Sequence, residues 1–259
     1  MENLQKLALP LRFPEFTQNL RQRNLGDIAK FLKGKGISKS DIKEDGINEC
    51  IRYGELYTHY KETISNILSK TNKSKDESVL SQKNDIIIPS SGETQLDIAT
   101  ASCVMKPNVI LGGDLNIIRS NEDGVYLSYY LNSRKKIDIA KLSQGNSVVH
   151  LYAKQLSTLK INLPEFSEQK KIATFLSSVD EKINQLQKKK ELLDHYKKGM
   201  MQKIFKQEIR FKGENGKDFP NWKKRYYFRF WIFLLWKKCS KVFTFTRCPY
   251  SMCTIRRTL

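Results

Sequence analysis

Apolar residues are arranged in two different ways along this chain. Between residues 25 and 163 they form short runs separated by glycine, proline and polar residues, a pattern that predicts short strands and helices. Three consecutive isoleucines in NDIIIPSSGET indicate a buried strand, and the Pro-Ser-Ser-Gly sequence after them indicates a turn. Two further strands are expected around Gly112-Gly113, and GVYLSYYLNSRKKIDIAKLS has helical spacing. We therefore predict an α+β protein with one mixed α/β domain over residues 25–163.

From residue 164 to residue 208 the pattern is that of one long helix. The sequence from 167 to 207 contains no proline and a single glycine, and Ser167 is the expected N-cap, with Glu168 in the first turn. Apolar residues recur every 3.5 residues, which is typical of a coiled-coil seam interrupted only by Lys190 and Lys197. The expected seam residues are Ile172, Leu176, Val179, Ile183, Leu186, Leu193, Met200 and Ile204.

A helix of forty residues would be about 60 Å long and could not bury such a seam alone. It needs an antiparallel partner, either from this chain or from another one. The alternative is an amphipathic helix that folds back on its own domain.

The two ends of the chain differ from this domain and helix. Residues 1–24 are expected to form an irregular arm, because Pro10 and Pro14 prevent a regular helix. The arm contains LRFPEF, and residues 209–222 contain the similar IRF and DFPNW, so they are interpreted as the start of a second repeat. Residues 223–259 are expected to form an irregular tail.

The charge of the chain is strongly positive but unevenly distributed. The formal net charge is +19, which points first to a polyanion such as nucleic acid. Residues 223–259 contain ten Lys/Arg and no Asp/Glu, so residues 1–222 carry 36 basic and 27 acidic residues, or +9. The tail could itself bind nucleic acid or a membrane surface, although it lacks the periodicity of an amphipathic helix.

Signals for an enzyme are missing from the sequence. It contains no P-loop, no G-x-G-x-x-G and no H-E-x-x-H, and His59, His150 and His195 are isolated. We therefore expect no catalytic residues, no metal site and no cofactor. The five cysteines include no C-x-x-C pair, and no signal peptide or membrane span is recognisable, so a reducing cytoplasm is the expected location.

Three polar loops are better candidates for function, because their side chains could bond to phosphates and base edges. Ordinary turn chemistry is the alternative for each loop taken alone. The candidate DNA-binding residues are Arg52, Tyr53 and Thr58 in IRYGELYT; Ser90, Ser91, Gly92 and Thr94 in PSSGET; and Gln144, Asn146, Ser147 and His150 in SQGNSVVHLY.

Taken in order, these motifs resemble the specificity subunit of type I restriction-modification systems. The motifs are GDI (26–28), CIRYGELYT (50–58), DIIIPSSGET (85–94), GGDLNIIR (112–119), LSYYLNS (127–133), QGNSVVHLY (144–152) and INLPEFSEQKKIATFLSSVDEKI (161–183). The last is the most specific, and the resemblance covers residues 11–222.

The resemblance implies a non-catalytic bacterial cytoplasmic subunit with a target-recognition domain that reads a half-site in double-stranded DNA. It also implies a spacer helix that docks the methyltransferase (M) subunits, with restriction (R) subunits joining the complex. A full member repeats the unit, whereas here the second copy stops resembling the first near residue 223, so we hypothesise a reading-frame change at 223–225. A self-dimer through the helix would restore two recognition domains. The alternatives are a non-functional or interfering fragment, and a coiled-coil adaptor with no DNA role.

Overall fold

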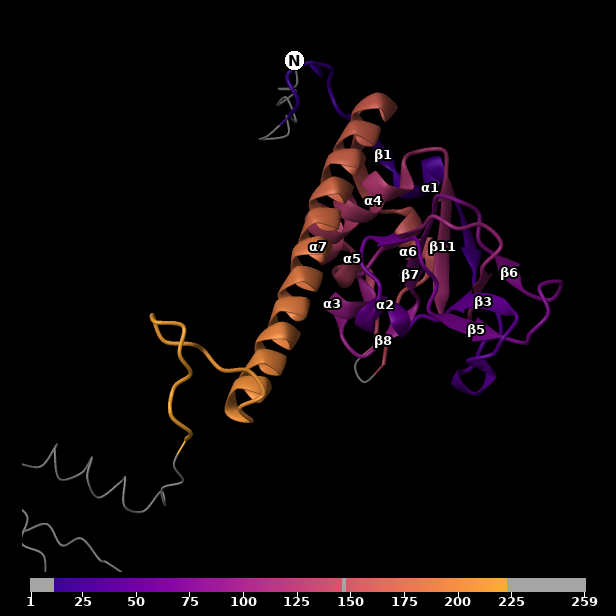
Figure 1. Ribbon diagram of the computed structural model, residues 1–259. Helices are drawn as coiled ribbons and strands as arrows, with labels where there is room; N and C mark the ends of the chain where they lie inside the picture. The colour runs from indigo at the N-terminus through magenta and orange to yellow at the C-terminus, as the bar shows by residue number, and fades with distance from the viewer. Residues whose placement is uncertain (1–11, 146–147, 223–259) are drawn as a thin grey trace, which may run out of the picture. The chain divides into compact units, whose positions relative to one another are not determined.

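The computed structural model describes residues 12–145 and 148–222. The described part of the chain divides into two units, one ending at Lys189 and the other beginning at Lys190. The first unit contains the sheets and short helices, together with the beginning of the long helix α7 (Phe166–Phe205) (Figure 1). The architecture confirms the predicted mixed α/β domain followed by a long helix. The predicted irregular tail lies outside the described residues.

A five-stranded sheet forms the centre of the domain, with the strand order β2-β11-β7-β9-β4. Its strands pair antiparallel, apart from the parallel pair β4–β9. The strands are β2 (Ala29–Lys33), β4 (Thr63–Ile64), β7 (Asp85–Pro89), β9 (Ser102–Val104) and β11 (Leu115–Ser120).

A second sheet of four strands has the order β5-β3-β10-β6, in which only β3 and β10 run parallel. Two further antiparallel ribbons, β1–β13 and β8–β12, join segments that are far apart in sequence. The strands are β3 (Asn48–Ile51), β5 (Ser69–Thr71), β6 (Val79–Leu80), β10 (Ile110–Leu111), β1 (Arg21–Asn24), β13 (Lys160–Leu163), β8 (Ser91–Gly92) and β12 (Val149–His150).

Short helices fill the connections between these strands. They are α1 (Leu25–Ile28), the 3₁₀-helix η1 (Lys39–Asp41), α2 (Glu55–Thr58), α3 (Gln95–Ile98), α4 (Gly124–Tyr130), the π-helical turn η2 (Leu131–Lys135), α5 (Lys136–Leu142) and α6 (Ala153–Ser157). The helical spacing over 124–142 is therefore confirmed, with one π turn between α4 and α5.

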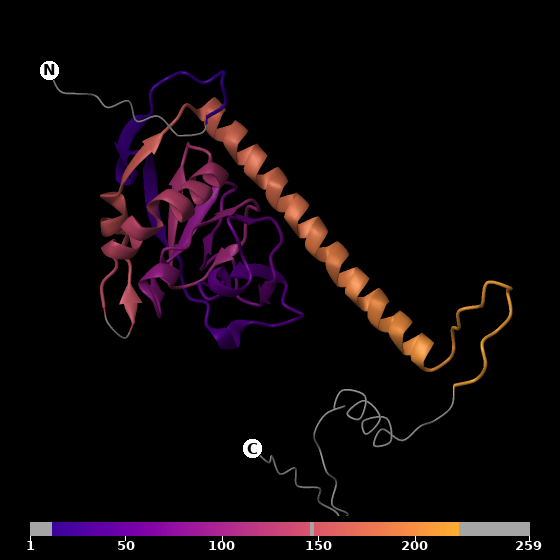
Figure 2. The ribbon, with the colours of Figure 1, turned by 90° about the vertical axis from the view of Figure 1, so that its left-hand side faces the viewer.

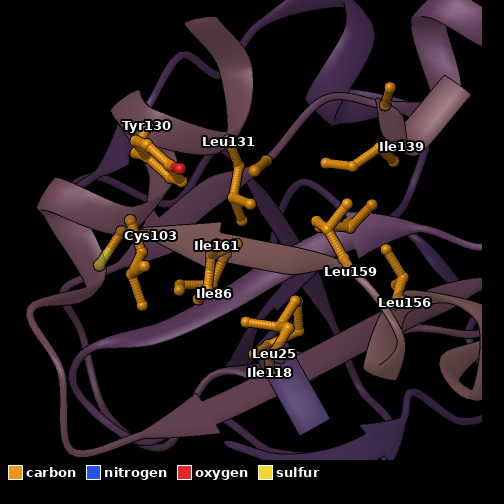
Figure 3. Packing of buried hydrophobic residues seen from close by; sticks show 14 of the residues in the cluster. Leu25, Ile86, Cys103, Ile118, Tyr130, Leu131, Ile139, Leu156, Leu159 and Ile161 are labelled. Atoms are coloured by element: carbon orange, nitrogen blue, oxygen red, sulfur yellow. The ribbon is translucent and has the colours of Figure 1, made fainter. Parts of the chain in front are cut away.

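The isoleucine run of β7 is explained by burial on both faces of the central sheet. Ile86 and Ile88 belong to the larger core cluster, which includes Leu131 of η2 and Leu156 of α6 (Figure 3). Ile87 faces the other way and belongs to a second cluster with Ile51 and Leu111. Since successive residues of a strand point to opposite faces, a strand with two apolar faces reads as a continuous apolar run.

Helix α7 is fixed to the domain at its first turns. Gln169 is fully buried, and its side-chain amide donates to Glu122 at 2.6 Å and to the Pro164 carbonyl at 3.0 Å, while its oxygen accepts from the Asp123 N–H at 3.1 Å. Farther along the helix, Asp180 accepts a hydrogen bond from the Tyr129 hydroxyl, and Asn184 accepts one from Lys61 at 3.3 Å.

Some local predictions were wrong at the ends of elements. Ser167 is the second residue of α7 and not its N-cap, because the helix already begins at Phe166. The arm expected to be irregular over 1–24 ends in β1, which pairs with β13 of the same domain. Proline restricts only its neighbours, and backbone pairing with a distant strand fixes residues 21–24.

Among the described residues, no helix is both long enough and apolar enough to cross a membrane.

Candidate nucleic-acid interface

The three predicted polar loops converge at one end of the domain, although they are about 40 to 60 residues apart in sequence. The first follows β3 and contains α2, the second follows β7 and leads into α3, and the third follows α5 and contains β12. Figure 1 shows α2, α3 and β8 beside one another below the central sheet. The contacts between these loops make them one surface.

The second and third loops are joined by backbone hydrogen bonding. Strand β8 pairs with β12, with Ser91 opposite His150 and Gly92 opposite Val149. The Leu151 N–H also donates to the Ser90 carbonyl at 3.0 Å. These bonds satisfy the peptide groups of both loops and fix their register.

Tyr57 of α2 joins the first loop to this ribbon. Its hydroxyl donates to the Ser91 carbonyl at 2.8 Å. A Cβ atom on Gly92 would lie only 2.9 Å from this hydroxyl oxygen, so the close approach requires glycine at that position. Burial is the largest cause that raises the pKa of the Tyr57 phenol, followed by Tyr53, Asp97 and Asp114, so this group stays a neutral donor at physiological pH.

Predicted residues of the first loop differ in how accessible they are. The Arg52 guanidinium donates to the buried Glu55 at 3.1 Å and is partly covered. Tyr53 is 38% exposed, and its ring meets Tyr57 edge-on with centroids 6.3 Å apart. The Thr58 hydroxyl is exposed and donates to the Gly54 carbonyl at 3.2 Å. Tyr53 and Thr58 are therefore open to a ligand, and Arg52 is held in place.

Predicted residues of the second loop serve mainly to build it. Ser90 and Ser91 are only 8% and 9% exposed, and their carbonyls accept the bonds that join the loops. Thr94 is the N-cap of α3 and is exposed: its hydroxyl oxygen accepts from the Asp97 N–H at 3.1 Å and donates to the Asp97 carboxylate at 2.6 Å.

The third loop presents exposed polar and aromatic side chains. Gln144 and His150 exchange backbone hydrogen bonds of 2.8 and 2.7 Å, and both side chains are exposed. The His150 ring stacks on Tyr152, with centroids 6.2 Å apart and an angle of 20° between the ring planes. Asn146 and Ser147 lie outside the described residues. Tyr152 is 53% exposed and was not among the predicted residues, although it follows the same polar segment.

The surface formed by these loops is polar rather than strongly basic. The described residues of 52–59, 90–97 and 144–152 include one arginine and three carboxylates, of which Glu55 is buried. The excess positive charge of the first 222 residues therefore lies elsewhere on the chain. Within the loops themselves, groups that could bond to bases are therefore more numerous than positive charges that could attract phosphates.

No group of three or more His, Cys, Asp or Glu side chains could hold a metal ion within residues 12–145 and 148–222.

The predicted seam of α7 is covered at its beginning and exposed farther along. Ile172 packs against the main core cluster, and Leu176 is partly buried. Val179 and Ile183 are each 41% exposed, and Leu186 and Leu193 are 54% and 55% exposed. Every residue from 181 to 198 is exposed. The helix thus presents a line of apolar side chains that its own domain does not cover over this stretch.

Comparisons with known proteins agree with this architecture. The family model for the type I restriction modification DNA specificity domain matches residues 18–194. This chain belongs to that family. A relative in the family, the type I restriction enzyme MjaVIII specificity subunit of Methanocaldococcus jannaschii, is 30% identical over 197 residues.

Two solved structures share the family fold. The type I restriction-modification system S subunit from M. genitalium has a TM-score of 0.53 at 20% identity over 78% of this chain. A chain from a study of complex assembly and conformational transition of the type I R-M system has a TM-score of 0.52 at 15% identity over 74% of this chain. The matches cover only 43% of the MjaVIII subunit and 48% and 46% of the two solved chains, so this chain spans about half the length of such relatives.

One residue of the family resemblance has a structural role that sequence reasoning missed. Glu168 was interpreted as a helix-initiating carboxylate, and it does lie in the first turn of α7. It is also fully buried and accepts hydrogen bonds from Arg12 at 2.7 and 2.6 Å. Glu168 and Gln169 are both fully buried, and nothing in the sequence indicated this, because such polar residues are usually exposed.

Proposed function

We propose that this chain is a DNA-specificity unit whose recognition domain, over residues 25–163, reads one half-site in double-stranded DNA. The convergence of three separate polar loops on one surface carries this proposal, together with membership of the specificity-domain family. The unit has no catalytic role of its own. It directs methyltransferase subunits, and through them restriction subunits, to the chosen sequence in the cytoplasm.

Within the loop surface, the proposed roles divide by accessibility. Tyr53, Thr58, Thr94, Gln144 and His150 have exposed side chains that can meet base edges or phosphates. Arg52, Ser90, Ser91 and Gly92 hold the surface in shape, and Arg52 keeps part of its guanidinium accessible. Asn146 and Ser147 belong to the same loop in sequence, and we keep them as proposed contacts.

Selection of bound duplexes from a random DNA library tests the recognition role. We expect the protein with its methyltransferase subunit to enrich a specific sequence, with affinity that falls steeply as salt rises. Gln144→Ala should lose about 1–3 kcal/mol of discrimination at one position of that sequence. Gln187→Ala, at an exposed glutamine on α7, is the matched control and should leave the selected sequence unchanged.

We also propose that α7 pairs antiparallel with α7 of a second copy and offers the same region to the methyltransferase subunits. The exposed seam supports this, because solvated leucines and valines at 3.5-residue spacing gain from burial against a like helix. Two copies related by a two-fold axis would then present two identical recognition domains.

Two leucines next to each other on α7 provide a matched test of this pairing. Leu193 lies in the seam and Leu192 does not, yet they are 55% and 61% exposed. Leu193→Asp should shift sedimentation toward the monomer and weaken co-purification with the methyltransferase subunit, whereas Leu192→Asp should do neither. If the two substitutions had equal effects, the prediction that Leu193 belongs to the pairing seam would be wrong. If the unsubstituted protein and both variants were monomers, self-pairing would be excluded.

A further inference from the structure

The two similar segments near the ends of the described chain both use an arginine to organise their backbone. Arg12, in LRFPEF, donates to the Gln18 carbonyl at 2.5 Å. Arg210, in the segment ending DFPNW, donates to the Phe219 and Pro220 carbonyls at 2.5 and 2.7 Å. We call residues 12–18 the first arm and residues 209–222 the second arm. Their likeness in sequence is thus accompanied by a likeness in local hydrogen bonding.

The first arm has a receptor on α7, near the start of the helix (Figure 2). Arg12 makes two hydrogen bonds to the buried carboxylate of Glu168. Phe13 meets Phe175 edge-on with centroids 6.2 Å apart, and the Lys171 ammonium lies 4.5 Å from the centre of the Phe13 ring. The receptor therefore consists of a carboxylate, an ammonium group and an aromatic ring in consecutive turns of one helix.

The second arm has the groups that would fit such a receptor but no receptor within the described residues. Arg210 makes no ion pair there, and its described hydrogen bonds are all to the second arm itself. Phe211, which occupies the position of Phe13, is 70% exposed. A guanidinium next to an exposed aromatic side chain is the combination that Glu168 and Phe175 accept from the first arm.

Antiparallel pairing of two α7 helices would bring a receptor to this arm. The predicted seam runs from Ile172 to Ile204, and its centre at residue 188 falls within the stretch 181–198, in which every residue is exposed. If two helices pair antiparallel about that centre, residue 168 of one lies level with residue 208 of the other. Arg210 is only two residues farther along the chain.

We propose that, in a pair of chains, the second arm of one copy competes with the first arm of the other copy for Glu168 and Phe175. This inference rests on the proposed antiparallel pairing. Exchanging Arg12 for Arg210 replaces one guanidinium–carboxylate pair by an equivalent one, as in domain swapping. The pairing of the helices makes the exchange intramolecular, so the effective concentration of the second arm at the receptor is high.

Competition predicts effects of opposite kind for the two arginines. In the Arg12→Ala variant, the first arm no longer fills the receptor of the monomer. In the pair, Arg210 of the other copy can still fill it. The dissociation constant of the pair should therefore fall roughly tenfold, since charge-assisted bidentate contacts are strong. Adding Arg210→Ala to this variant should abolish the gain. Sedimentation equilibrium on the full chain measures both values, and circular dichroism checks that each variant is folded.

A photo-crosslinker locates the second arm directly, without altering Arg12. Phe211 is replaced by benzoyl-phenylalanine in a mixture of ¹⁴N- and ¹⁵N-labelled full-length chains. We expect mixed-isotope crosslinks from residue 211 to residues 165–175. The same replacement at Phe13 is the control, and most of its crosslinks to Phe175 should join peptides of the same isotope, because the first arm contacts its own helix.

The two proposals fail in different ways. If chains pair but residue 211 gives no mixed-isotope crosslink to 165–175, or if Arg12→Ala fails to tighten the pair, the exchange of arms is wrong and the pairing stands. If no variant pairs at any concentration, the proposed self-pairing is wrong and the exchange falls with it.

Discussion

At the scale of single residues, two buried carboxylates each require an arginine partner. Glu168 is held by Arg12, and Asp85 is held by Arg119 at 2.8 and 2.7 Å. Asp85 is 1% exposed and also accepts the Gln82 N–H at 2.7 Å, so it both begins β7 and neutralises Arg119. In both pairs, hydrogen bonding to the carboxylate raises the pKa of the arginine. Burial makes each pair more sensitive to removal of one partner than a surface ion pair would be.

Replacing Asp85 by asparagine should therefore destabilise the domain. The substitution keeps the shape but removes the charge that compensates Arg119, and we expect a loss of about 2–3 kcal/mol in the free energy of unfolding. Urea denaturation followed by circular dichroism measures it. Asp45→Asn, at an exposed carboxylate, is the control and should change stability by less than about 0.5 kcal/mol.

The buried cysteines should be unreactive in the folded domain. Cys50 and Cys103 are both fully buried, and burial raises their pKa to about 11 and about 12 from an ordinary value near 9.0. With Cys239, Cys248 and Cys253 replaced by serine, we expect almost no reaction with a disulfide reagent at pH 8 until the domain is unfolded. Because these pKa values are raised on folding, the thiols ionise more readily in the unfolded chain. The free energy of unfolding should therefore fall as pH rises from about 9 to about 12. Rapid labelling of the native protein at pH 8 would contradict this burial.

At the scale of elements, the first turns of α7 attach the helix to the domain. Gln169 alone bonds to Glu122, Asp123 and Pro164. Gln169→Ala leaves these buried groups unpaired, so it should cost about 2 kcal/mol of unfolding free energy and speed amide exchange in the first turns of α7. Gln185→Ala removes one exposed hydrogen bond to Glu181 and should change neither quantity.

Elements with strong local signals were predictable, and those that depend on distant partners were not. The isoleucine run of β7 and the 3.5-residue repeat of α7 were both recognisable, because a strand that is apolar on both faces and a helix with one apolar stripe each have a distinctive local pattern. By contrast, no helix was predicted for the tyrosine-rich segment after β3, which contains α2, and β1 was taken for irregular chain. Long-range pairing and burial override local propensity in such short segments.

The π turn η2 shows the same limit within a helix that was predicted. The Asn132 side chain accepts from the Ala101 N–H at 2.7 Å and donates to the Ala101 carbonyl at 2.9 Å, which ties this turn to the segment before β9. A π turn in the middle of a helical segment has no periodicity signal of its own.

At the scale of the whole molecule, the candidate site was predictable as a set of loops but not as a surface. Sequence placed polar residues on three turns. The pairing of Ser91 with His150 and the bond from Tyr57 bring those turns together. Which side chains remain open to a ligand then follows from burial, which separates the exposed Gln144 and His150 from the buried Ser90 and Ser91.

The proposed pairing of two such units makes a distinct prediction about the DNA sequence that they select. Two copies related by a two-fold axis must read the same half-site twice in opposite orientation, so the sites should be palindromic with a gap of fixed length. Sequencing for modified bases in a host that carries this gene with its methyltransferase subunit gives the motif. An asymmetric bipartite motif would show that a different recognition domain occupies the second position. With Leu193→Asp, methylation of the palindrome should be lost, whereas with Leu192→Asp it should persist, because only the former residue lies in the seam through which the two domains are joined.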